Sequence, residues 1–195
     1  MNRRSVVMAA VMAAVGFAVL TGAIAQQQQQ QQRQGGGAPA AAATGPFDGK
    51  PLKEAIVGSW RLLISDGVRS DGTQVPQWGP NPKGVVMFGP DGRYSLQIMR
   101  DIRPKFAAND RLKGKPDEIK AAFEGAISHF GSYAVNDQDK SLTFRIEGSS
   151  YPNWDETKQM RVITALWQDD LTWTVPTPST QAFGEKTNLA WRRIK

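Results

Sequence analysis

Apolar and polar residues alternate in short runs along most of residues 57–194. The clearest run is 93–100, where Tyr94, Leu96 and Ile98 alternate with Ser95 and Gln97. A period of two residues predicts a strand with one face turned toward a core. The same kind of pattern predicts about eight strands, over residues 57–65, 83–88, 93–100, 131–135, 141–147, 158–167, 171–175 and 188–194.

Turn residues separate these runs and indicate how the strands connect. Residues 89–92 read Gly-Pro-Asp-Gly, which predicts a tight turn because proline presets φ and glycine permits positive φ. Connections this short favour antiparallel neighbours. Eight antiparallel strands predict a closed up-and-down barrel, an all-β fold that leaves no sheet edge exposed. A two-sheet sandwich is the alternative.

One segment has the period of a helix. Pro116 is followed by two acidic residues, a composition typical of a helix N-terminus. Apolar residues then recur at spacings of three and four, at Ile119, Ala122, Phe123, Ala126, Ile127 and Phe130. This stripe predicts one amphipathic helix over 115–130 that packs on the sheet or on the barrel mouth.

The first 46 residues differ in composition from the rest. Arg3 and Arg4 precede an apolar run over 6–20, and Ala-Ile-Ala follows at 23–25. This predicts a signal peptide over 1–25 and a periplasmic or secreted product, by the Sec or the twin-arginine route; an uncleaved anchor is the alternative. Residues 26–46, QQQQQQQRQGGGAPAAAATGP, offer no large side chain to bury. They predict a disordered tether, followed by the barrel domain over 47–195.

Composition and charge exclude several classes of function. The chain has no cysteine and one histidine, so no disulfide or thiolate zinc site is available and no metal site is expected. Two of its 24 basic residues and none of its 18 acidic ones lie in 1–25, so the formal charge falls from +6 to +4 without that segment. No basic block suggests nucleic acid binding, and no cofactor is expected because no nucleotide-binding motif follows a strand.

Few residues suggest covalent chemistry. His129 is the only histidine and, at the end of the predicted helix, is either a general base or a structural residue. His129, Glu147 and Tyr133 are the candidates for proton transfer. A hydrolase is disfavoured because no Gly-x-Ser-x-Gly motif is present.

Three short segments carry candidate ligand contacts. Gln97 reaches a ligand if the polar face of its strand points inward, whereas on the outer face it is an ordinary surface residue. Basic residues over 100–105, with Arg100 and Arg103, either attract an anionic head group or form a solvated loop. Tyr151, Asn153 and Trp154 either stack on a ligand at the barrel mouth or pack as a loop over one barrel end.

Several motifs resemble one known family. Gly58-Ser59-Trp60 on the first strand resembles the Gly-x-Trp signature of lipocalins, in which the Trp closes one barrel end under a basic residue of the last strand. The run Trp191-Arg192-Arg193 stands where that partner is expected, with Trp191 and Arg192 as the signature residues. Four further segments, at residues 78–84, 90–100, 129–133 and 147–154, resemble the bacterial and fungal lipocalin-like domain family.

The resemblance covers the whole predicted domain and implies a lipocalin-type barrel. The leading expectation is a protein that binds a small apolar or amphipathic molecule, with no membrane span once the signal is removed. The second is an isomerase, cyclase or hydratase acting on such a molecule. The third is an envelope interaction module with a packed barrel interior.

Overall fold

The structure is a computed structural model, and it describes residues 50–195. The predicted signal peptide and tether lie outside the described residues. The described part is mostly strand. Its elements are α2 (Leu52–Ala55), β1 (Gly58–Val68), β2 (Gln74–Pro76), β3 (Lys83–Phe88), β4 (Arg93–Met99), α3 (Pro116–Glu124), β5 (Ala126–Asn136), β6 (Ser141–Ser149), η1 (Pro152–Trp154), β7 (Lys158–Trp167), β8 (Asp170–Val175) and β9 (Lys186–Arg193).

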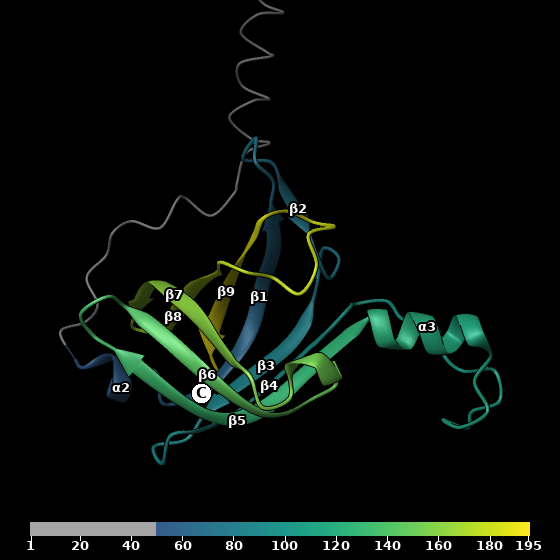
Figure 1. Cartoon of the computed structure of the whole chain (residues 1–195), viewed down its shortest axis with the longest axis horizontal. Helices are drawn as coiled ribbons and strands as arrows, with labels where there is room; N and C mark the ends of the chain where they lie inside the picture. Colours follow the sequence, from purple (N-terminus) through teal and green to yellow (C-terminus); the bar gives the residue numbers. More distant parts are fainter. Residues whose placement is uncertain (1–49) are drawn as a thin grey trace, which may run out of the picture. The chain divides into compact units, whose positions relative to one another are not determined.

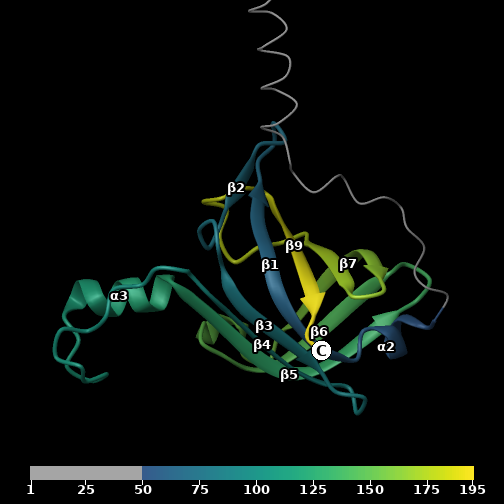
Figure 2. The ribbon, with the colours of Figure 1, turned by 180° about the vertical axis from the view of Figure 1, so that it is seen from behind.

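The strands form a closed antiparallel barrel. Each barrel strand pairs with the next one along the chain, and β9 pairs back onto β1 from Trp60 opposite Arg193 to Val68 opposite Lys186. β2 is an additional strand that pairs only with the end of β1. Figures 1 and 2 show β1 and β9 side by side from opposite directions. The predicted eight-stranded up-and-down barrel is therefore confirmed, and the sandwich is excluded.

Trp60 closes one end of the barrel. Its ring is fully buried and its Nε1 donates to the Ile56 carbonyl oxygen at 2.8 Å. The guanidinium of Arg193 lies 4.0 Å from the centre of this ring and donates to the carbonyl oxygens of Ala55 and Val57, each at 2.7 Å. Gly58 has φ +127°, and a Cβ there would lie 2.8 Å from Arg193 Nη1. The Gly-x-Trp motif thus makes room for the arginine that covers the Trp.

Within the predicted run Trp191-Arg192-Arg193, Arg193 covers Trp60, and the choice of Arg192 as the signature residue was wrong. Successive strand residues point to opposite faces, so Arg192 points outward and pairs with Asp170 at 2.9 Å. Trp191 points inward, is fully buried, and lies 5.0 Å from Trp173, centre to centre. The last strand therefore contributes Trp191 to the core and Arg193 to the cover over Trp60.

The predicted helix is too long. α3 ends at Glu124, and residues 126–130 belong to β5, where Met99 pairs with Ala126 and Leu96 pairs with His129. Pairing with β4 satisfies the backbone along a whole ladder, which outweighs the helical spacing of Ile127 and Phe130. α3 buries none of its residues, so its stripe does not pack on the sheet; Phe123, near the end of the helix, lies at the barrel mouth, the other surface expected for the stripe. Figure 1 shows α3 outside the barrel, next to the start of β5.

Within residues 50–195, no helix is long and apolar enough to cross a membrane. No group of three or more His, Cys, Asp or Glu in the same part of the chain is arranged to hold a metal ion.

Candidate ligand-binding site

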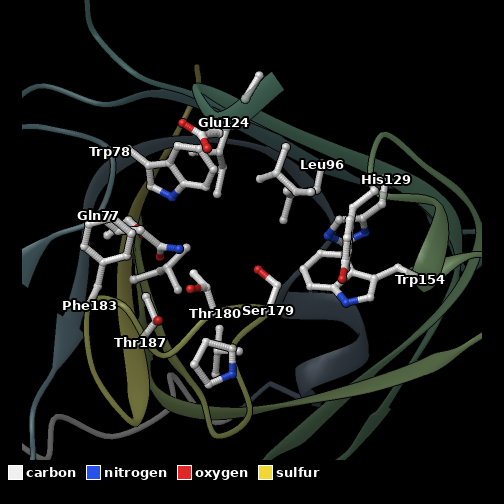
Figure 3. Close-up of a pocket in the computed structure, with 18 of the residues that line it drawn as sticks. Gln77, Trp78, Leu96, Glu124, His129, Trp154, Ser179, Thr180, Phe183 and Thr187 are labelled. Carbon is white, nitrogen blue, oxygen red and sulfur yellow. The ribbon is translucent and has the colours of Figure 1, made fainter. Parts of the chain in front are cut away.

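A cavity of about 480 Å³ lies inside the barrel at the end opposite Trp60. The strand ends β1, β4, β5, β7, β8 and β9 supply its wall, and the segments 77–78, 123–124, 151–154 and 178–183 supply its rim. Figure 3 shows Gln77, Trp78 and Phe183 on one side of this space and His129 and Trp154 on the other. The volume is within the range of small-molecule sites.

The alternation of each strand decides which side chains line the cavity. Leu96 and Ile98 of β4 are each 4% exposed and point into it, as do Leu189 of β9 and Trp173 of β8. Ile127 adds apolar surface near the rim. Most of the wall is therefore aliphatic or aromatic, which suits an apolar molecular body.

His129 lies in this wall within an aromatic cluster. It is 3% exposed, and its Nδ1 lies 2.8 Å from the Tyr94 hydroxyl oxygen. The ring packs edge-on against Phe144 and Trp154, with centres 5.5 and 5.6 Å away. Burial, aided by the charge of Arg161, lowers the pKa of His129 to about 3, so the imidazole is neutral at pH 7. Burial also raises the pKa of Tyr94, so the phenol is neutral.

Arg161 of β7 is the charged group inside the barrel. It is 5% exposed and lines the cavity. Its guanidinium lies 5.4 Å from the centre of the Phe144 ring and donates to the Met160 carbonyl oxygen and to Gln159 Oε1, each at 2.9 Å. Burial lowers the pKa of Arg161 to about 10, which still leaves it charged at pH 7. Among residues 50–195 no carboxylate forms an ion pair with it.

Two further polar groups in the wall have no hydrogen-bond partner within the described chain. They are the hydroxyl of Ser65 in β1 and the indole Nε1 of Trp173 in β8, both buried and both in the cavity lining. Such groups are uncommon in native interiors because each one costs free energy when it is left unpaired. A third such atom, Trp191 Nε1, is buried in the core outside the cavity lining.

The predicted site residues fall into two groups. Arg100, Tyr151, Trp154 and His129 line the cavity together. Gln97 and Glu147 do not, because they alternate with buried residues and lie on the outer face, where Glu147 pairs with Arg93. The alternative that placed Gln97 in the lumen is therefore wrong.

Three other candidates also lie away from the cavity lining. Arg103 is exposed and donates to Met99 Sδ at 3.1 Å, and Asn153 is exposed in η1. Tyr133 is buried nearer the closed end, where its hydroxyl donates to the Gly89 carbonyl oxygen at 2.8 Å. The proposed trio of His129, Glu147 and Tyr133 is thus not brought together at one site.

Sequence reasoning missed Arg161, Ser65 and Trp173, three of the residues that bring buried polar atoms to the wall. A signal for Arg161 was present, since it occupies the same alternating phase as Ile163 in a strand with a buried face. A charged residue in an inward phase is unusual and points to a functional site.

Comparison with known proteins identifies the family of this chain. The family model for the lipocalin-like domain matches residues 57–194. A 4'-hydroxy-3'-methoxypropiophenone carrier protein of Aspergillus oryzae (strain ATCC 42149 / RIB 40) is 26% identical over 106 residues, which is 51% of this chain and 96% of the relative. Among solved structures, a redesigned beta barrel aligns over 73% of this chain and 95% of its own, with 15% identity and a TM-score of 0.39. The chain belongs to the lipocalin-like domain family.

Proposed function

We propose that this protein binds a small apolar or amphipathic molecule in the barrel cavity and carries it without changing it chemically. The observation that supports this is the cavity itself, with about 480 Å³ of space, a largely apolar wall and a few buried polar groups. The relative described as a carrier of an aromatic ketone is in keeping with this role. A fully packed interior, which the interaction-module hypothesis requires, does not fit a space of this size.

The enzyme hypothesis has less support. A general base works best when its pKa is near the working pH. The pKa of His129 is about 3 and that of Tyr94 is raised, so neither group exchanges protons readily at pH 7. The pair is suited to holding a ligand in place.

The test is a titration with N-phenyl-1-naphthylamine, a neutral probe that fluoresces in apolar sites, together with native mass spectrometry of the purified protein. Binding at one site per chain is expected. Ile127→Trp fills the rim of the cavity and should abolish binding, whereas Ala134→Trp, on the exposed face of the same strand, should leave it intact. Equal binding by both variants would mean that the probe sits elsewhere, and no binding to the unmodified protein would refute the proposal.

We also propose that the protein acts outside the cytoplasm, on the strength of the sequence over 1–25. The test is a fusion of residues 1–46 to a reporter that is active only after export. A reporter that remains inactive would contradict export.

A further inference from the structure

We propose that the carried ligand is an amphipathic organic anion, and that its oxyanion pairs with Arg161 inside the barrel. This inference rests on the proposed function and adds the chemical class of the ligand and its orientation, with the charged end deep in the cavity and the apolar body against the β4 and β9 walls.

The first argument is the uncompensated charge of Arg161. A buried cation is stable only with a counter-charge or a full set of hydrogen bonds. A guanidinium has five N–H donors, and two of those of Arg161 are taken, by the Met160 carbonyl and by Gln159. Three donors remain on a side chain that is 5% exposed and faces the cavity. A planar fork of this kind matches the two oxygens of a carboxylate.

The second argument is independent of Arg161 and concerns its neighbours in the wall. Trp173 lies opposite Ile163, two residues along β7 from Arg161, and Leu189 lies between Trp173 and Ser65 in the sheet. The unpaired Trp173 Nε1 is a donor only, and the Ser65 hydroxyl also donates. Both residues line the same cavity as Arg161, and a ligand rich in acceptors suits their unpaired donors; a third unpaired donor, Trp191 Nε1, lies outside the lining.

The third argument is that no unpaired carboxylate in the lining competes with a ligand for Arg161. Glu124 is the one acidic residue among the described residues that line the cavity, and its Oε1 already accepts from Lys120 Nζ at 2.6 Å at the rim. Arg100 lines the rim as a second cation. The lining thus carries two arginines and one paired carboxylate, a field that draws an anion inward and disfavours a cation.

The aromatic cluster supplies the remaining selectivity. His129 is held neutral beside Tyr94 and adds no charge to compete with Arg161 for the ligand. When Tyr94 donates to Nδ1, the proton of His129 is on Nε2, which makes no hydrogen bond to any residue within 50–195 and is then a further donor. The Trp154 ring beside it offers a flat apolar surface for the ligand body.

The test uses two ligands of nearly the same shape, 1-naphthaleneacetate and 1-naphthaleneacetamide, which differ in charge. Each displaces N-phenyl-1-naphthylamine from the unmodified protein and from three variants, Arg161→Met, Arg161→Lys and Arg145→Met. Arg145 lies on the exposed face of β6 and serves as the matched control. The neutral probe itself reports whether each variant has kept a folded cavity.

The expected result is that the acetate binds at least tenfold more tightly than the amide. Arg161→Met should lose that preference, because its affinity for the acetate should be at least tenfold lower than that of the unmodified protein and its affinity for the amide less than threefold lower. Arg161→Lys should retain part of it, and Arg145→Met all of it. Equal binding of acid and amide to the unmodified protein, or a preference that survives Arg161→Met, would overturn the anion proposal while the carrier function stands. No binding of the neutral probe would overturn the carrier function itself.

Discussion

Replacing Arg161 with methionine is expected to stabilise the empty barrel. Methionine has a similar length, fills irregular space and carries no charge to desolvate. The pKa of Arg161 falls from 12.5 to about 10, and at about 1.4 kcal/mol per pH unit this corresponds to a cost of about 3 kcal/mol for keeping the guanidinium charged in the interior. The free energy of unfolding should therefore rise when the charge is removed.

Part of that gain is offset by lost contacts. Arg161 gives up its hydrogen bonds to the Met160 carbonyl and Gln159 and its position over the Phe144 ring, together on the order of 2 kcal/mol. The net stabilisation is therefore about 1 kcal/mol, or roughly 2–4 °C in Tm for a domain of this size. Structural ion pairs behave in the opposite way, because removing one partner of a buried pair is strongly destabilising.

The measurement is urea unfolding at pH 7 of ligand-free Arg161→Met, with native mass spectrometry to establish that no small molecule has co-purified. Arg145→Met is the control and should change the free energy of unfolding by less than about 0.5 kcal/mol, as exposed substitutions usually do. A loss of 2 kcal/mol or more in Arg161→Met would refute the reasoning. It would mean that the guanidinium holds the empty fold together and is not kept for a ligand.

The closed end of the barrel and the buried His129 lead to the remaining predictions. Arg193→Ala removes the cation over the Trp60 ring and two hydrogen bonds, and it should lower the free energy of unfolding in denaturant by about 3 kcal/mol. Arg192→Ala removes only an exposed ion pair and should lower it by less than about 1 kcal/mol. Equal losses would contradict the role assigned to Arg193. Gly58→Ala should also destabilise, by about 1–3 kcal/mol in the same assay, because of the positive φ and the 2.8 Å approach to Arg193; a neutral effect would show that the barrel end relaxes easily. The pKa of His129 is about 3 in the folded chain and about 6.5 in the unfolded chain, so the unfolded chain binds more protons between these pH values. As the pH is lowered from 6.5 to about 3, the free energy of unfolding should therefore decrease by up to about 1.4 kcal/mol per pH unit. His129→Gln should lose this part of the pH dependence, and an unchanged dependence would contradict the burial argument.

The barrel was predictable because its signals are local and agree with one another. The alternation of Tyr94, Leu96 and Ile98 specifies both the strand and its inward face, and short turns leave an antiparallel order as the simplest solution. The helix boundary was not predictable in the same way. Ile127 and Phe130 fit a helical stripe as well as a strand, and only the ladder with β4, a long-range interaction, decides between them.

The candidate site was predictable where residues sit in loops at one barrel end, as Arg100, Tyr151 and Trp154 do. It was not predictable where the decision depends on the phase of a strand. A shift of one residue turns a side chain from the lumen to solvent, which separates Arg193 from Arg192.

Strand phase also explains why Arg161, a charged residue at an inward position of β7, is the most informative residue of the site. In β7, Arg161 stands where an aliphatic residue would lower the energy of the empty barrel, and the fold bears the cost of its charge. The same strand phase places Arg161 in the cavity wall, which is also lined by Ser65 of β1 and Trp173 of β8, each with a side-chain polar atom that has no partner in the described chain. Three departures from a well-satisfied interior thus belong to residues that line one cavity, and a fourth, the unpaired Nε1 of buried Trp191, lies in the core outside that lining. An anion that binds at Arg161 would explain why the costliest of these departures, a buried charge without a counter-charge, is kept.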